Sequence, residues 1–326
     1  MKKKQTEESW IQWLKQYSLP SPQGIGDDAS LCQIGRKTLV VSKDLLVENT
    51  HFRLTTTSPF DLGQKAISVN LSDLAAMGAK PYGFFLGLGL PPQLFRSQWP
   101  EQFMQGMFQV IHSLPWPFPL LGGDTVKAER VTLSLTVMGT QKPSLIKTRK
   151  GLKKGDILAV TSPLGASQWG LKLLTANPRK KKWVHPWEQA AVDHHLRPRA
   201  QWAEGLWLAK FSAVHAMMDL SDGLYRDCSR LADLNQLQLS LDLDLLPLAP
   251  GIKDPLLALA SGEEYALLIA VDPLAIGELQ TKFQRQFARP LFPVGKVVGK
   301  GKGRMKVQLL QRGRHVSWKG AGFDHF

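Results

Sequence analysis

The sequence predicts an α+β protein of two domains, each built from mixed layers of helices and strands. A chain of 326 residues is long for one domain and short for three. Helix and strand patterns mix along its length without a regular βαβ repeat, which favours α+β layers over a doubly wound sheet. A polar, basic stretch at residues 141–155, broken by one proline and two glycines, marks a boundary. We therefore predict domains at residues 1–145 and 146–326.

Hydrophobic periodicity predicts the elements of the first domain. A helix within residues 1–22 carries Trp10 and Trp13 and ends at two prolines. The elements after it are a strand at 38–42, a helix at 65–77, a helix at 98–114 and a strand at 131–137. Gly78 is the stop signal of the second of these helices.

The second domain shows the same mixture of patterns. Its predicted strands and helices, in chain order, are a strand at 156–160, a helix at 167–175, a strand at 214–218, a helix at 222–233 and strands at 237–243 and 265–271. A basic insert at 178–186 interrupts them. We assign it no function.

The charge balance allows two interpretations. Lys and Arg total 41 against 27 Asp and Glu, a formal net charge of +14, which is compatible with nucleic-acid binding. The basic residues gather at 179–182 and 296–314 without a recognisable nucleic-acid-binding motif, so a solvated surface that attracts phosphorylated metabolites explains them better. We expect no nucleic-acid partner.

The composition also bears on the compartment. Cys32 and Cys228 lie far apart in the sequence, which indicates neither a disulfide framework nor a cysteine zinc site. No apolar run approaches the roughly 20 residues of a membrane-spanning helix. The basic N-terminus continues into polar residues, unlike a signal peptide. We expect a cytoplasmic protein without a membrane segment.

Seven aspartates fall in five short polar segments. The segments are Gly24–Asp28, Ser42–Asp44, Asn70–Asp73, Gly122–Thr125 and Met218–Leu224. Each has an ordinary explanation as an exposed turn, a cap or a glycine turn, although Asn, Ser and Asp are poor choices for a helix interior. Together they offer only oxygen ligands, which select hard ions such as Mg²⁺, and Mg²⁺ in enzymes usually accompanies phosphates. The sequence therefore predicts a magnesium and nucleoside-triphosphate site that transfers a phosphoryl group.

Two of these segments have features that suit phosphate itself. The paired glycines Gly122 and Gly123 let the backbone approach a phosphate closely, with Asp124 beside them for its metal ion. Ser221 and the N–H groups at the start of the 222–233 helix can hold phosphate oxygens.

The order and content of these motifs resemble the thiamine-monophosphate kinase family. This family belongs to a superfamily of ATP-binding enzymes with aminoimidazole ribonucleotide synthetase, selenophosphate synthetase and a hydrogenase maturation factor. The resemblance runs from Gly24 to Phe326. It implies domains of the aminoimidazole ribonucleotide synthetase type and a homodimer formed through the N-terminal domain. It also implies phosphorylation of thiamine monophosphate to thiamine diphosphate with ATP as co-substrate and several Mg²⁺ ions, without a covalent enzyme intermediate.

The resemblance also assigns residues to roles. The family's magnesium ligands match Asp28, Ser42, Asp44, Asp73, Asp124, Asp219 and Asp222, with Asp27 beside them. Its nucleotide contacts match Gly123, Asp124, Arg149 and Ser221, and its thiamine contacts match His51, Glu263 and Phe323. Asp44, Asp73, Asp222 and Arg149 are the expected catalytic residues. Alone, His51 would be an ordinary histidine, Glu263 and Glu264 a solvated pair, and Phe323 a hydrophobic plug.

The sequence departs from the family pattern in two places. Lys43 stands in the metal segment where the family has Thr, and its ammonium group could replace part of one ion's charge. An extra residue occurs within Gly320–Gly322, before the terminal aromatic residue. The number of bound ions and the position of that aromatic ring are therefore open.

The implied mechanism is in-line transfer of the γ-phosphate to a terminal phosphate oxygen of thiamine monophosphate. Such a reaction requires mainly positioning and charge neutralisation, which includes positive charge from Arg149 near the leaving group. A phosphate monoester is already a competent nucleophile at neutral pH. We expect no general base.

Three other interpretations are considered. Selenophosphate synthetase would carry a reactive cysteine where this chain has Ser21, Pro22 and Gln23. Aminoimidazole ribonucleotide synthetase would lack the set of three thiamine contacts. A non-enzymatic nucleic-acid-binding protein would explain the charge but leaves the seven aspartates unexplained.

Overall fold

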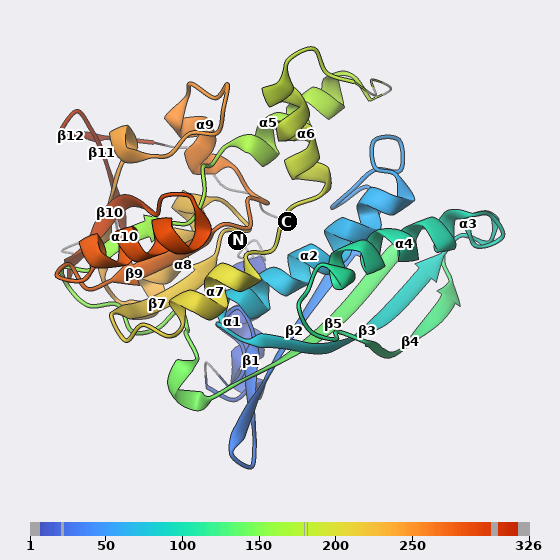
Figure 1. Ribbon diagram of the computed structural model, residues 1–326, viewed down its shortest axis with the longest axis horizontal. Helices are drawn as coiled ribbons and strands as arrows, with labels where there is room; N and C mark the ends of the chain where they lie inside the picture. The colour runs from blue at the N-terminus through green and yellow to red at the C-terminus, as the bar shows by residue number, and fades with distance from the viewer. Residues whose placement is uncertain (1–6, 21–22, 179, 181, 301–305, 319–326) are drawn as a thin grey trace, which may run out of the picture.

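Two β-sheets with helices packed on them make up the computed structural model, which describes residues 7–20, 23–178, 180, 182–300 and 306–318. The predicted α+β class is confirmed. The chain passes from the first sheet to the second between Gln141 and Ile157. Figure 1 shows the two sheets on opposite sides of the molecule, with helix α2 (Pro59–Ala76) running from one towards the other.

The first sheet has the strand order β1-β2-β5-β3-β4. Its strands are β1 (Ser30–Ile34), β2 (Lys37–Val47), β3 (Lys80–Leu90), β4 (Leu120–Lys127) and β5 (Thr132–Gln141). Only β3 and β4 pair in parallel; the other pairs are antiparallel. Helices α2 and α4 (Trp99–His112) lie along one side of this sheet, while α1 (Glu7–Leu14) and α3 (Pro92–Phe95) are peripheral (Figure 1).

The opposite face of the first sheet is exposed. Leu45 pairs with Ser134, Ser134 with Gly87 and Gly87 with Asp124, so these positions share one face. Leu45, Phe85 and Val126 are 53%, 42% and 54% exposed on that face, and we call these three residues the open face.

The second sheet has the order β12-β11-β8-β10-β6-β9-β7. Its strands are β6 (Ile157–Val160), β7 (Val214–Asp219), β8 (Gln238–Asp242), β9 (Leu267–Val271), β10 (Phe292–Gly299), β11 (Val307–Gln311) and β12 (Arg314–Val316). Helix α8 (Leu224–Asn235) packs on one face through Cys228 and Leu231, and α10 (Ile276–Phe287) on the other through Leu279 and Phe283. The remaining helices are α5 (Ala166–Ala176), α6 (Pro186–Leu196), α7 (Trp202–Leu208) and α9 (Pro255–Ala260).

The C-terminal end of α2 fixes the two sheets relative to each other. Ala75 and Ala76 lie in one buried cluster with Met217 of β7 and Leu267 of β9. Helix α7 approaches so closely that a Cβ atom on Gly205 would lie 2.1 Å from the carbonyl oxygen of Ala75. Because interiors are close-packed, this contact holds α2 against the second sheet.

Most predicted elements are present with shifted ends. Helix α2 begins six residues before the predicted 65–77 helix, because Ser58 caps it and Pro59 starts it. The segment Gly122–Thr125, for which a glycine turn was the alternative to a phosphate contact, lies within strand β4, which the sequence did not predict. A Cβ atom on Gly123 would lie 1.9 Å from the carbonyl oxygen of Leu86, so this glycine permits close strand packing. Among the described residues, no helix is both long and apolar enough to cross a membrane.

Candidate active site

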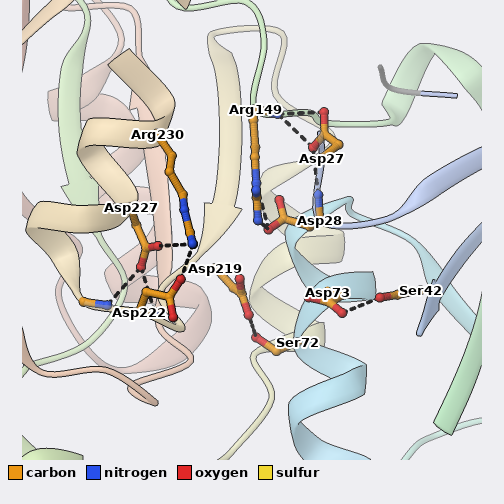
Figure 2. Close-up of polar contacts among 11 residues, drawn as sticks. Asp27, Asp28, Ser42, Ser72, Asp73, Arg149, Asp219, Asp222, Asp227 and Arg230 are labelled. Carbon is orange, nitrogen blue, oxygen red and sulfur yellow. Dashed lines mark hydrogen bonds and ion pairs between the residues drawn. The ribbon is translucent and has the colours of Figure 1, made fainter. Parts of the chain in front are cut away.

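Three carboxylates from separate parts of the chain meet between the two sheets. Asp28 precedes β1, Asp73 lies in the last turn of α2, and Asp219 ends β7. One oxygen of each lies within 4.8 Å of the other two. Figure 2 shows these side chains close to one another around the end of α2. We call Asp28, Asp73 and Asp219 the carboxylate cluster.

Helix α2 organises the cluster through two adjacent residues. Ser42 Oγ on β2 donates a hydrogen bond of 2.5 Å to Asp73 Oδ2. Ser72 Oγ, one position earlier on the helix, donates one of 2.7 Å to Asp219 Oδ2. The helix therefore binds the first sheet with one residue and the second with its neighbour (Figure 2). This explains why polar residues unfavourable to helices stand in its interior.

The electrostatics of the carboxylate cluster fit a bound cation. Burial, together with repulsion from neighbouring carboxylates, raises the pKa of Asp73 and of Asp219 well above the usual value. The Oδ2 atom of Asp28 is buried and has no hydrogen-bond partner within the described part of the chain. An oxygen-only donor set with an unpartnered buried oxygen suits a hard divalent ion.

Arg149 neutralises part of this charge. Its Nη2 and Nε atoms donate to Asp28 Oδ1 at 2.5 and 3.2 Å, and its backbone N–H donates to Asp27 Oδ1 at 3.0 Å. Burial opposes the guanidinium charge, but Asp28 outweighs it and raises the pKa of Arg149. Burial, followed by repulsion from Asp28, raises the pKa of Asp27 to about 7.

A second acidic group lies at the start of α8. Asp222 forms an ion pair with Arg230, and Asp227 Oδ2 accepts hydrogen bonds of 3.2 Å from the backbone N–H groups of both Asp222 and Gly223 (Figure 2). These are amides that the sequence predicted to be available for phosphate. That expectation is wrong for both groups, because the buried Asp227 carboxylate already occupies them.

A cavity of about 600 Å³ opens beside these groups. Its lining includes five residues singled out from the sequence, namely Asp44, His51, Ser221, Asp222 and Glu263. Asp44 connects the cavity to the carboxylate cluster, since its charge contributes to the raised pKa of Asp73. Burial also raises the pKa of Asp44 itself.

Glu263 and Glu264 are not a solvated pair. The Glu263 side chain is 28% exposed and contacts Lys65 and His195. Glu264 is 2% exposed and receives hydrogen bonds from the backbone N–H groups of Gly165 and Ser167. The two adjacent carboxylates therefore point to different partners and have different surroundings.

Four residues expected at the site, namely Lys43, Gly123, Asp124 and Phe323, are elsewhere in this chain or outside the described residues, and Gly123 lies beside Asp124 on β4. Lys43 lies on the open side of the first sheet, where its Nζ donates to Ser134 Oγ, whereas Ser42 and Asp44 face the interior. The expectation that its ammonium group replaces part of one ion's charge in this site is therefore wrong. Asp124 lies on edge strand β4, three strands from β2. Phe323 lies outside the described residues.

Sequence reasoning missed four titratable residues that touch the expected site residues. They are Lys65, His195, Asp227 and Arg230. The sequence predicted that this helix begins at residue 65. Lys65 was therefore expected at a helix end, where a lysine side chain is normally solvated. Spacing offered one signal, since Asp227 and Arg230 are three residues apart in a predicted helix and therefore lie on one face.

We expect the metal-free protein to lose thermal stability as the pH rises from about 4 to about 7. Asp27 shows why: its pKa is about 7 in the folded state against an ordinary 3.8, and those of Asp73 and Asp219 are also raised. The folded state therefore binds more protons than the unfolded chain in this window, so the free energy of unfolding falls as the pH rises.

Added Mg²⁺ is expected to raise the Tm more at about pH 8 than at about pH 5. At the higher pH these carboxyl groups are ionised, and Mg²⁺ would offset their negative charge. Scanning fluorimetry with and without Mg²⁺, after removal of divalent ions, measures both effects. A magnesium-dependent gain in Tm that does not change with pH would contradict this expectation.

Comparison with known proteins places this arrangement in a family. Residues 26–141 match the N-terminal domain of the AIR synthase related proteins, and residues 153–308 match their C-terminal domain. The thiamine-monophosphate kinase of Leptospira interrogans is 32% identical, over 94% of this chain and 94% of the relative. That of Escherichia coli K12 is 32% identical, over 93% and 91%.

Solved structures give the same result. The complex of AaThiL with AMPPCP and TMP superposes with a TM-score of 0.82 at 28% identity and covers 98% of this chain and 97% of that one. The thiamine-monophosphate kinase of Stenotrophomonas maltophilia K279a has a TM-score of 0.77 at 29% identity, with 94% and 95% covered.

The chain is thus an AIR synthase related protein with both domains of that class. Within that class, the chain belongs to the thiamine-monophosphate kinase family. The resemblance drawn from the five aspartate segments is confirmed.

Proposed function

We propose that this chain transfers the γ-phosphate of ATP to thiamine monophosphate and forms thiamine diphosphate and ADP. The observation that carries the proposal is the position of Asp44. It lines the cavity that also contains His51 and Glu263, and its charge acts on Asp73 of the carboxylate cluster. A cavity that can hold an organic ligand therefore lies beside the carboxylate cluster, which can hold metal ions. Phosphoryl transfer between two anions requires both.

The residues of the chain have separate parts in this reaction. Asp28, Asp73 and Asp219 would hold Mg²⁺ with Asp44 and Asp222 nearby, while Ser42 orients Asp73 through its hydrogen bond. Bound Mg²⁺ ions supply positive charge that offsets the repulsion between the two phosphates. We assign the nucleotide contacts to Ser221, which lines the cavity, and to Gly123, Asp124 and Arg149.

The transfer needs one bond made and one broken. An oxygen of the thiamine monophosphate phosphate attacks the γ-phosphorus while the bond from that phosphorus to the β,γ-bridging oxygen breaks. ADP leaves with the electron pair. The attacking oxygen is already anionic, so the chain has to orient the two phosphates and supplies no base. The guanidinium group of Arg149, which pairs with Asp28, can turn towards the leaving phosphate and stabilise the negative charge that develops there.

We further propose that the chain works as a homodimer and that Asp124 serves the partner's site. Within one chain Asp124 lies three strands from Asp44. Strand β1 pairs with residues Lys37–Val41 of β2, so residues 42–47, which include the metal segment Ser42–Asp44, form an edge of the sheet. Edge strand β4 carries Asp124 at the other side of the same sheet.

Pairing of these two edges across a two-fold axis would join the sheets of two chains. Residues 122–125 of one chain would then lie alongside residues 42–47 of its partner, and the open face would be covered. A symmetric dimer satisfies both edges at once. Exposed Leu45, Phe85 and Val126 support this arrangement, because they present apolar area to the partner.

The assay that tests the function is formation of thiamine diphosphate from ATP and thiamine monophosphate, followed by chromatography. We expect product at millimolar Mg²⁺ and at least a hundredfold less after chelation, since the uncompensated carboxylates then repel the phosphates. ATP hydrolysis without thiamine diphosphate would contradict the proposed substrate. We place the reaction in the cytoplasm, where ATP is present.

A further inference from the structure

Lys65 is a buried lysine that forms an ion pair with Glu263. Its side chain is 2% exposed, and its Nζ lies 2.8 Å from Glu263 Oε1. Lys65 is on α2, which packs on the first sheet, whereas Glu263 belongs to the second half of the chain. A buried ammonium group without a counter-charge is costly, so this pair ties the cavity wall to α2.

The segment that carries Glu263 is conformationally strained. Glu263 and Tyr265 have φ values of +57° and +50°, in the left-handed region that non-glycine residues seldom adopt. The Glu263 N–H donates to Ser221 O at 2.7 Å and the Tyr265 N–H to Leu220 O at 2.8 Å. Such strain persists where surrounding contacts enforce it, which is common at ligand sites.

The second oxygen of Glu263 faces a neutral group. His195 Nδ1 lies 3.3 Å from Glu263 Oε2 and 3.1 Å from Ser167 Oγ. Burial, and then the charge of Lys65, lowers the pKa of His195 to about 3. Burial alone would raise the pKa of Glu263, but Lys65 outweighs it and the pKa of Glu263 lies below its usual value.

Lys65 lies behind the cavity wall and does not contact a ligand in the cavity directly. Glu263 and His195 line the cavity, and Lys65 does not. The neighbouring Glu264 also stays out of the lining and accepts hydrogen bonds at the start of α5 instead. Lys65 therefore acts on a ligand through groups of the cavity wall, of which Glu263 is the one that it contacts directly.

We propose that Lys65 is a positioning residue for the organic part of the substrate. It holds Glu263 as an ionised carboxylate in one orientation in the cavity wall, which favours a cationic or hydrogen-bond-donating heteroaromatic ring over a neutral apolar one. This inference rests on the proposed function and names the residue behind its recognition of the thiamine moiety.

The test compares kinetic constants of the full-length enzyme and the variants Lys65→Met, Glu263→Gln and the double variant. Lys65→Met is expected to raise KM for thiamine monophosphate by about tenfold or more, with kcat and KM for ATP within about twofold. The double variant is expected to match Glu263→Gln, because a residue that acts through Glu263 adds nothing once its charge is gone.

Lys147→Met is the matched control. Lys147 is also buried, but its Nζ donates to the carbonyl oxygens of Phe211 and Val214, away from the cavity. We expect it to lower the Tm and to leave KM for thiamine monophosphate within about twofold.

An unchanged KM for thiamine monophosphate in Lys65→Met would overturn the inference, and so would a double variant that binds clearly more weakly than Glu263→Gln. If Lys65→Met does not fold, the double variant decides, since it contains no unpaired carboxylate. Failure of the double variant to fold would show that Lys65 has a structural role of its own and would also overturn it. Wild-type enzyme that forms no thiamine diphosphate would instead overturn the proposed function.

Discussion

Asp73→Asn is expected to lower kcat by about a thousandfold or more while the protein remains folded. The substitution removes one of three charges whose oxygens lie within 4.8 Å of one another. An amide of the same shape can still accept the hydrogen bond from Ser42, so the end of α2 keeps its contact with β2. What is lost is the charge that would bind the ion.

The same variant is expected to melt at a higher temperature than the wild type when divalent ions are absent. Burial and repulsion raise the pKa of Asp73, so its charge opposes folding in the metal-free state. Circular dichroism, Tm and thiamine diphosphate formation measure the three effects. Asp272→Asn, on the loop after β9, is the control and should change none of them by much. Near-normal turnover by Asp73→Asn would remove the assignment of the carboxylate cluster to the metal.

Mixed dimers of two inactive variants are expected to regain activity. Asp73→Asn disables the site of its own chain, whereas Asp124→Asn disables the site of its partner if Asp124 acts across the dimer. A heterodimer of the two then contains one intact site. We expect each homodimer to have below about 1% of wild-type activity, and the heterodimer about half.

Co-expression with two different affinity tags and sequential purification yields the heterodimer for this assay. If Asp124 served its own chain, both sites of the heterodimer would be damaged and no activity would return. Failure to recover both tags together would contradict the homodimer itself. A heterodimer of Asp73→Asn with wild-type chains is the control and should also have about half of the wild-type activity per dimer.

Periodicity predicted the elements better where one face is buried than where an element is exposed on both. Strand β5 alternates buried and half-buried residues and was found from that pattern. Helix α2 was found from its apolar spacing, but it is buried on nearly all sides and its start was predicted six residues late. Strand β4 is exposed along most of its length, so its side chains carry no alternation, and its two glycines suggested a phosphate contact or a turn instead of a strand. Its pairing with β3 depends on residues some 35 positions earlier in the chain, which no local pattern reports.

The aspartate set was predictable because chemistry limits the residue types that bind hard cations. Its partners were not. In the sequence alone, nothing distinguishes these partners from ordinary surface residues. Only packing makes them buried or paired, and they are Lys65, His195, Asp227 and Arg230. Conversely, Lys43 stands between two expected ligands in the sequence yet faces away, because successive strand residues point to opposite sides of the sheet.

The sequence by itself determined the class of fold, the family and the set of oxygen donors that can bind a metal ion. The tertiary structure decided which of those donors meet. Asp28, Asp73 and Asp219 converge because α2 packs against both sheets, and Asp124 is left on a distant edge. The physical reason is that ligand chemistry is a property of single side chains, whereas their convergence, burial and raised pKa values arise only from contacts between segments far apart in the chain.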